Sequence, residues 1–361
     1  KRNYPDVKSD LCTCFIERGH SLTADRGYIA MITASSWMFI SSFEKMRERL
    51  IDDTRIVSMI QQSTHGFPFV TVPTTMFVLQ PGSALKTGCY IRLQDFDRPQ
   101  WQQPRALEAI KNPTCGWFYR RDASTFHQIP GSPIAYWVGD GLFNAYSFGQ
   151  LLGNEIDARV GMISGNNNRF LRRWTEVSSF KIGFAGSQAS PSNEKWIPIQ
   201  KGGEFRLWYG NLDYVINWEN DGWEIKKDNY DGPRIRSHNY NGQMAYRSGI
   251  TWNSITSGRF QCRYTPAGFL FDAAGPLCYV KDSSLVRYIL GFMSSNVFVE
   301  IMRIVNPTLN FPPNYLEQTP LIEHAALKST INDRVDQCID ISKLDWDSFE
   351  TSWDFKRHPL V

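Results

Sequence analysis

The chain has 361 residues, of which 42% are hydrophobic and 21% are charged, and its net charge is +3. These values are typical of a globular protein, and so small a charge does not establish a nucleic-acid partner. No apolar run approaches the length of about 18 residues that a membrane-spanning helix needs, so we expect no membrane span. Twelve tryptophans raise the aromatic share to an unusual 14%.

Seven cysteines are scattered along the chain without paired C-x-x-C spacing. This spacing argues against a structural zinc site and predicts reduced thiols in a cytoplasm. None of the six histidines has a partner at metal-ligand spacing, so we expect no metal. The N-terminus lacks the apolar stretch of a secretory signal.

The first eighty residues alternate between helical and strand patterns. Residues 9–23 predict a helix that Ser9 caps, with an apolar stripe formed by Leu11, Phe15, Ile16 and Leu22. Residues 27–37 form a short apolar run that is typical of a buried parallel strand. A helix over 43–52 and strands over 55–62 and 71–80 follow, and Pro73 favours an edge or a bend.

This order of elements is that of the trailing half of a doubly wound, Rossmann-like α/β domain. The first strands of such a domain, and the glycine-rich turn that carries the cofactor, have no counterpart after Lys1. We therefore expect that Lys1 is not the natural beginning of the protein.

The rest of the chain changes character twice. A strand over 89–96, a helix over 103–112 and a Pro/Gly/aromatic connector come first. Short strands and frequent turns follow to about Gly275, then a long amphipathic helix over 284–305 and a helix over 324–343. The predicted fold is α/β followed by α+β, and the predicted domains are 1–82, a connector 83–156, a mixed domain 157–320 and a helical segment 321–361.

Several long stretches resemble one family. They are "NYPDVKSDLCTCFIERG", "GYIAMITASSWMF", "STHGFPFVTVPTTMFVLQ", "GMISGNNNRFLRRWTEV", "KGGEFRLWYGNLDYVINWENDG", "GITWNSITSGRFQCRYTPAGFLFD", "NPTLNF" and "ISKLDWDSFETSWDFKRHPL". They resemble the PglX family of adenine-specific DNA methyltransferases from BREX phage-defence systems. Type IIG restriction-modification enzymes are near relatives of that family.

The resemblance implies S-adenosylmethionine as the cofactor, and double-stranded DNA and other defence subunits as partners, in a bacterial or archaeal cytoplasm. The family's glycine-rich loop and its Asn-Pro-Pro-Tyr motif are absent from this sequence. In that motif the Asn side chain and a Pro carbonyl accept hydrogen bonds from the adenine amine, and the Tyr stacks on the flipped base. We therefore expect an interior fragment with no catalytic residue and no methyl transfer of its own.

Two aromatic residues lie in the loop before the strand over 71–80. In similar enzymes an aromatic residue of this loop covers the second face of the flipped adenine. Phe67 is the favoured candidate for this base-stacking role and Phe69 is its rival. The alternative is a loop aromatic that only closes the edge of the sheet.

The stretch "GMISGNNNRFLRRW" combines a glycine turn with three asparagines and three arginines. Asn side chains can read adenine, and Arg side chains can pair with phosphate. The alternative is a hairpin turn whose asparagines take left-handed angles, which leaves the arginines unexplained. We predict DNA contacts by Asn166, Asn167, Asn168, Arg169, Arg172 and Arg173, the three arginines on phosphates.

The stretch over 201–222 resembles the start of the family's recognition domain. Trp208 and Trp218 favour core packing, because buried aromatic rings dominate core energetics. Lys201 and Arg206 are predicted to contact phosphate. Further along, Arg259, Gln261 and Arg263 share one face of a predicted strand and could read base edges. A solvated antiparallel strand is the alternative for these three residues.

The favoured function is DNA sequence recognition within an adenine-N6 methyltransferase of phage defence. One rival is a non-catalytic DNA specificity module, similar to the specificity subunit of type I restriction systems. A second rival is a catalytically dead interaction protein.

Overall fold

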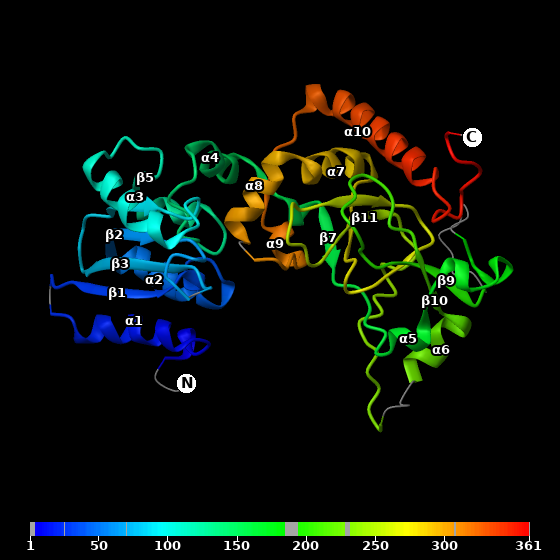
Figure 1. Cartoon of the computed structure of the whole chain (residues 1–361), viewed down its shortest axis with the longest axis horizontal. Helices are drawn as coiled ribbons and strands as arrows, with labels where there is room; N and C mark the ends of the chain where they lie inside the picture. Colours follow the sequence, from blue (N-terminus) through cyan, green and yellow to red (C-terminus); the bar gives the residue numbers. More distant parts are fainter. Residues whose placement is uncertain are drawn as a thin grey trace. The chain divides into compact units, whose positions relative to one another are not determined.

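The computed structural model describes residues 4–24, 26–69, 71–184, 194–227, 232–306 and 308–360. The chain divides into two compact units, one of residues 1–148 with 304–307 and one of 149–303 with 308–361 (Figure 1). The division falls at Phe148, within the segment that the sequence predicts to be a connector. Most of that predicted connector therefore folds with the first unit.

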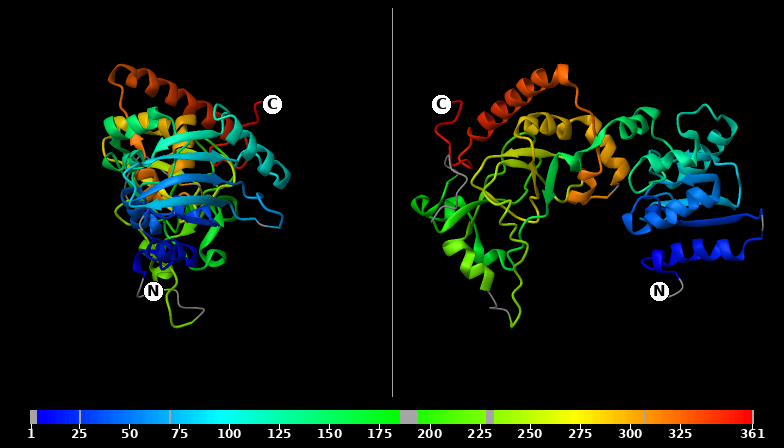
Figure 2. Two further views of the ribbon diagram at one scale, coloured as in Figure 1. Left: turned by 90° about the vertical axis from the view of Figure 1, so that its left-hand side faces the viewer. Right: turned by 180° about the vertical axis from the view of Figure 1, so that it is seen from behind.

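A five-stranded mixed sheet forms the centre of the first unit (Figure 2). Its order is β1-β3-β2-β4-β5, with β1 (Ile29–Ala34), β2 (Thr54–Gln61), β3 (Thr74–Pro81), β4 (Thr87–Arg92) and β5 (Phe118–Asp122). β3 pairs antiparallel with both β1 and β2, β2 is parallel to β4, and β5 is antiparallel to β4. The α/β class is confirmed in this coarse form, whereas the first strand pairs antiparallel rather than parallel.

Of the two alternatives for Pro73, the bend is correct, because Pro73 follows a bend at Val72 and precedes β3, which is an interior strand. The expectation of a buried parallel strand within residues 27–37 is wrong. β1 is the outer strand among the described residues, so Ile32 is 58% exposed instead of buried on both faces.

The helices of the first unit are α1 (Leu11–Leu22), α2 (Glu44–Asp53), α3 (Pro99–Lys111) and α4 (Asp140–Phe148). Asp10, not Ser9, caps α1, because the Asp10 carboxylate accepts the Cys12 amide at 2.8 Å. Ile16 is buried, but Leu11, Phe15 and Leu22 are exposed, so most of the predicted apolar stripe does not pack against described residues of this unit.

A buried arginine ties α2 to the rest of the first unit. Arg47 is 1% exposed, and its guanidinium donates to the Trp37 and Ile40 carbonyls at 2.9 and 2.6 Å. It also donates from Nε to the Gly131 carbonyl at 3.0 Å. Carbonyls of the segment after β1 and of the segment before α4 thus share one cation, which fixes both segments beside α2.

The second unit contains two four-stranded sheets and a two-stranded sheet. Their orders are β13-β9-β10-β8, β12-β11-β14-β7 and β15-β6. The strands are β6 (Gln150–Leu151), β7 (Ile156–Arg159), β8 (Leu171–Arg173), β9 (Trp196–Gln200), β10 (Tyr214–Asn217), β11 (Gly249–Trp252), β12 (Cys262–Thr265), β13 (Leu270–Phe271), β14 (Leu277–Val280) and β15 (Pro320–Leu321). Phe170, Ile199, Ile216 and Trp218 lie in the core beside the first of these sheets. Trp218 is buried as predicted, and Trp208 is half-buried with a positive φ of 72°.

The helices of the second unit are α5 (Asn167–Phe170), α6 (Glu219–Lys227), α7 (Val286–Ser294), α8 (Asn296–Val305), α9 (Pro313–Glu317) and α10 (Ala325–Trp346). The single helix predicted over 284–305 is broken, with a bend of 71° between its two parts. Ser295 is extended (ψ 158°), and its hydroxyl accepts the Phe298 amide, so it ends α7 and caps α8. Within the described ranges no single helix is long and apolar enough to cross a membrane, although this bent pair passes by length and composition.

Candidate nucleic-acid interface

The carboxyl ends of three parallel strands meet at one edge of the first unit's sheet. Ala34 of β1 is paired with Thr74, Thr75 is paired with Gln61 of β2, and Gln61 is paired with Arg92 of β4. Ligands of open α/β sheets bind outside such carboxyl ends. The loop over 62–73, which joins β2 to β3, therefore lies at the edge where a site is expected.

Polar contacts hold the neck of this loop. The Gln62 amide donates to the Thr74 carbonyl at 2.9 Å, and the Thr74 hydroxyl donates to the Gln62 side chain at 2.7 Å. On the outer side, His65 contacts Asp97 through both its backbone amide and its ring. The hydrogen bond from His65 lowers the pKa of the Asp97 carboxyl below its ordinary value. The loop is thus anchored at both its neck and its flank.

The two candidate stacking residues differ in exposure. Phe67 is half-buried, whereas Phe69 is fully exposed and has a positive φ of 63°. A non-glycine residue rarely adopts this conformation without a reason. Both rings belong to the loop at the carboxyl edge, and Phe69 is the one that presents its faces to solvent.

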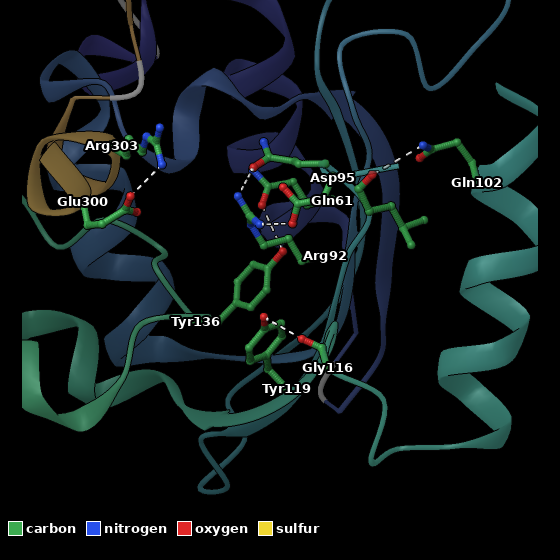
Figure 3. A network of polar contacts seen from close by, with 11 residues as sticks. Gln61, Arg92, Asp95, Gln102, Gly116, Tyr119, Tyr136, Glu300 and Arg303 are labelled. Atoms are coloured by element: carbon green, nitrogen blue, oxygen red, sulfur yellow. Dashed lines mark hydrogen bonds and ion pairs between the residues drawn. The ribbon is translucent and has the colours of Figure 1, made fainter. Parts of the chain in front are cut away.

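Next to this edge lies a network of polar contacts, which is buried at Tyr136 and Gln61 and reaches the surface at Asp95 (Figure 3). The Tyr136 hydroxyl donates to the Gln61 side chain at 2.9 Å, and its ring stacks on Tyr90 with centroids 4.6 Å apart. Burial raises the pKa of Tyr136 well above its ordinary value, so the hydroxyl keeps the proton that it donates. The Arg92 guanidinium bonds to Asp95 at 2.6 Å and lies over the Trp137 ring at 5.3 Å. The sequence marks these residues only as strand ends and aromatic connector.

One hollow in the described part of the first unit does not match the donor set that S-adenosylmethionine requires. This hollow lies on the sheet face and is lined by Ala30, Met31, Ile32, Ser58, Ile60, Met76, Phe77 and Val78. This lining contains no carboxylate for the ribose and no glycine-rich turn for close backbone approach. Over the part of the chain that the structure describes, no group of three or more His, Cys, Asp or Glu is placed to bind a metal. The chain's own residues are therefore assigned no contact with the cofactor.

In the second unit, the stretch over 161–173 forms a tight turn, a short helix and a strand. The Asn166 side chain accepts the Arg169 amide at 3.1 Å and caps α5, and the Ser164 hydroxyl donates to Asn167 at 2.5 Å. Asn167 and Asn168 are exposed, and Asn166 is half-buried. None of the three asparagines takes the left-handed angles of the turn alternative, because the positive φ in this turn belongs to Gly165. Asn166 and Asn167 both use their side-chain oxygens locally, and the Asn167 and Asn168 side chains are exposed.

The three arginines of this stretch have different surroundings. Arg169 is paired with Glu224 at 2.8 Å. Arg172 donates to the Asn168 and Leu171 carbonyls at 2.7 and 2.6 Å and is half-buried. Arg173 is exposed at the end of β8. Arg173 is therefore accessible to a ligand, whereas Arg172 can contact one only by giving up its two carbonyl partners, and Arg169 shares its charge with Glu224.

Lys201 and Arg206 are both committed to carboxylates of their own unit. Lys201 lies 3.0 Å from Asp272, and both side chains are largely buried. Arg206 lies 2.9 Å from Asp345 and over the Trp346 ring at 4.9 Å. A phosphate contact by either residue requires that it exchange its present partner.

The expectation that Arg259, Gln261 and Arg263 share one exposed polar face is wrong. Gln261 is 3% exposed and Arg263 is fully buried. The Arg263 guanidinium donates to Asn253 at 3.0 Å and to the Arg206 carbonyl at 3.4 Å, and burial lowers its pKa to about 10. Gln261 accepts the Arg206 amide, and Arg259 donates to the Ser294 carbonyl at 2.7 Å.

The physical reason is the irregular backbone around residue 206. The loop after β9 has no continuous ladder of its own, so its amides and carbonyls need side-chain partners. Gln261 and Arg263 satisfy them. Only Arg263 lies in β12, whereas Arg259 and Gln261 precede the strand, and the Gln261 and Arg263 side chains are buried in the unit.

The segment over 232–241, for which the sequence pattern predicts no site role, pairs with the asparagine-rich turn. Ile163 and His238 exchange backbone hydrogen bonds of 3.0 and 3.1 Å. The Asn241 side chain donates to the Val160 carbonyl at 2.6 Å. The cluster of Arg234, Arg236 and His238 is a signal in the sequence, but their separation from the turn by about seventy residues hides the pairing.

The sequence of the chain is similar to those of known DNA methyltransferases. Residues 1–67 match the Eco57I restriction-modification methylase family. The chain is 40% identical over 99% of its length to the adenine-specific methyltransferase PglX of Lacticaseibacillus casei (strain Zhang). It is 34% identical over its whole length to the adenine-specific methyltransferase BrxX of Escherichia coli O9:H4 (strain HS). The chain spans 30% and 29% of the lengths of these two proteins.

One solved structure shares the fold at a lower level of identity. It is the type IIL restriction-modification enzyme MmeI, determined in complex with DNA, with a TM-score of 0.54 and 12% identity. The match covers 96% of this chain and 46% of that one. The resemblance to adenine-specific methyltransferases of the PglX type is confirmed over the whole chain, and the MmeI match extends the shared fold across both units.

Proposed function

We propose that this chain is part of a site-specific adenine-N6 DNA methyltransferase of phage defence, and that its second unit recognises the duplex target. The observation that carries the proposal is the similarity of the whole chain to two curated adenine-specific methyltransferases. Such enzymes take the methyl group from S-adenosylmethionine and act on a base flipped out of the duplex.

The second unit supplies the groups that suit a duplex. Arg173 is exposed at the end of β8, where its guanidinium can pair with a phosphate, and the half-buried Arg172 beside it can join by exchanging its two carbonyl partners. Asn167 and Asn168 are exposed beside them and have the amide chemistry that reads adenine. Gln261 and Arg263 are left out because they are buried, and Lys201, Arg206 and Arg259 have internal partners.

The first unit supplies an aromatic loop. We assign base stacking to the loop over 62–73, with Phe69 as the fully exposed ring and Phe67 as the half-buried one. The anchors at Gln62 and His65 keep this loop at the carboxyl edge of the sheet. A ring held there can cover a flipped base, and such stacking contributes about 1–3 kcal/mol per base.

The test of the stacking role uses the natural gene product that contains this sequence. Phe67→Ala and Phe69→Ala are compared for transfer of tritiated methyl groups and for the fluorescence of 2-aminopurine placed at the target adenine. Loss of one ring should reduce transfer roughly ten- to hundred-fold and change the fluorescence of the flipped base. Leu85→Ala, an exposed apolar residue between β3 and β4, is the matched control.

If both Phe variants transfer methyl groups and flip the base like the unsubstituted protein, the stacking role is wrong. If the natural gene product transfers no methyl group to adenine but binds a defined sequence, the non-catalytic specificity module is the better description.

A further inference from the structure

The turn over 161–169, which includes the start of α5, and the segment over 232–241 are joined side by side by an isolated β-bridge. Their pairing rests on the two backbone hydrogen bonds between Ile163 and His238. Gly165 makes the close approach possible, because a Cβ atom there would lie 2.9 Å from the Cβ of Arg236, and its φ is +78°. We call residues 161–169 and 232–241 the paired loops.

Hydrogen bonds to neighbouring parts of the second unit hold the segment over 232–241 in place. The Ser237 hydroxyl lies 2.5 Å from the Ile225 carbonyl of α6, and Asn241 bonds to Val160. Asn239 and Asn241 have positive φ values of 57° and 47°, so the chain turns sharply at both. The segment after residue 231 nevertheless extends beyond α5 and α6 (Figures 1 and 2). It is an anchored projection of the second unit.

The side chains of the paired loops are of the types that contact DNA bases. Their formally charged side chains are Arg169, Arg234 and Arg236, and their sequence contains no Asp or Glu. Arg234, Arg236, Asn167 and Asn168 are exposed. Arg pairs bidentately with guanine and Asn with adenine in the major groove of DNA.

We propose that the paired loops enter the major groove of the DNA target and read its bases, with Asn167 and Asn168 on adenine and Arg234 and Arg236 on guanine. This inference rests on the proposed function of the second unit. It replaces Gln261 and Arg263, whose burial removes them from the surface, as the reading groups. Arg172 and Arg173 then hold the flanking phosphates and carry no sequence information.

The test is a selection from a pool of DNA duplexes with a randomised centre, carried out with the full chain. The unsubstituted chain should enrich one sequence. Asn167→Ala/Asn168→Ala and Arg234→Ala/Arg236→Ala should each lose preference at separate positions of that sequence, by roughly ten- to hundred-fold per base pair. Arg334→Ala, an exposed arginine of α10, should leave the enriched sequence unchanged.

Thermal unfolding of each variant, followed by circular dichroism, shows whether the second unit stays folded. If folded variants of the paired loops bind more weakly but enrich the same sequence, the loops contact only the DNA backbone and the reading role is wrong. If the unsubstituted chain binds no duplex even at low salt, the proposed function fails, and this inference fails with it.

Discussion

Two arginine-bearing segments of the second unit look alike as sequence and differ in the structure. In the segment over 166–173, Asn167 and Asn168 are exposed in α5 and Arg173 is exposed at the end of β8. In the segment over 259–263, Gln261 and Arg263 are buried and bond to an irregular loop. The same residue types thus serve a surface in one place and the interior in the other. The backbone beside each segment decides whether its polar side chains are exposed or buried, because the unpaired amides and carbonyls of a loop form hydrogen bonds with the nearest polar side chains.

The largest effect is expected from removing the buried guanidinium of Arg263. Arg263→Met should lower the free energy of unfolding by about 2–4 kcal/mol, because it leaves the Arg206 carbonyl and Asn253 without their donor. Denaturant titration of the chain measures the decrease. Arg334→Ala should stay within about 0.5 kcal/mol of the unsubstituted chain. A decrease as small as that of the control would show that Arg263 is not a structural residue.

Arg206 is intermediate between the exposed arginines that could bind DNA and the buried arginine that stabilises the unit. Arg206→Gln breaks an ion pair with Asp345, whose side chain is 59% exposed, and a contact with the Trp346 ring. An exposed pair and ring contact together stabilise by only about 1 kcal/mol or less. Denaturant titration should therefore show a small decrease in stability, and duplex affinity should change little. A large decrease in affinity would instead assign Arg206 to phosphate binding.

Local pattern predicted the elements of the chain better than their surroundings. The strand over 55–62 and the helix over 43–52 carry their own periodicity, and both exist within a residue or two of the predicted bounds. Asp10 and Ser9 are equally good caps by type, and only the geometry of the turn selects Asp10. Ser295 breaks a helix within an unbroken amphipathic pattern, because its hydroxyl caps the next helix.

The candidate site depended more on distant partners. The asparagine-rich turn and the loop of Phe67 and Phe69 were visible as motifs, since glycine, asparagine and aromatic clusters mark turns locally. The burial of Arg263 and the pairing of Ile163 with His238 were not visible, because each depends on residues far away along the chain. Alternation places side chains on one face only within a strand, and Arg259 and Gln261 lie before β12.

The most direct test of the central claim is the salt dependence of duplex binding, measured by fluorescence anisotropy. Three proteins are compared under conditions where all are folded: the unsubstituted chain, Arg172→Ala/Arg173→Ala and Arg263→Met. The double variant should bind every duplex more weakly, and its salt slope should fall by about 0.9 for each phosphate that is no longer neutralised. Arg263→Met should keep the slope of the unsubstituted chain. A reduced slope for Arg263→Met, with an unchanged slope for the double variant, would contradict the account.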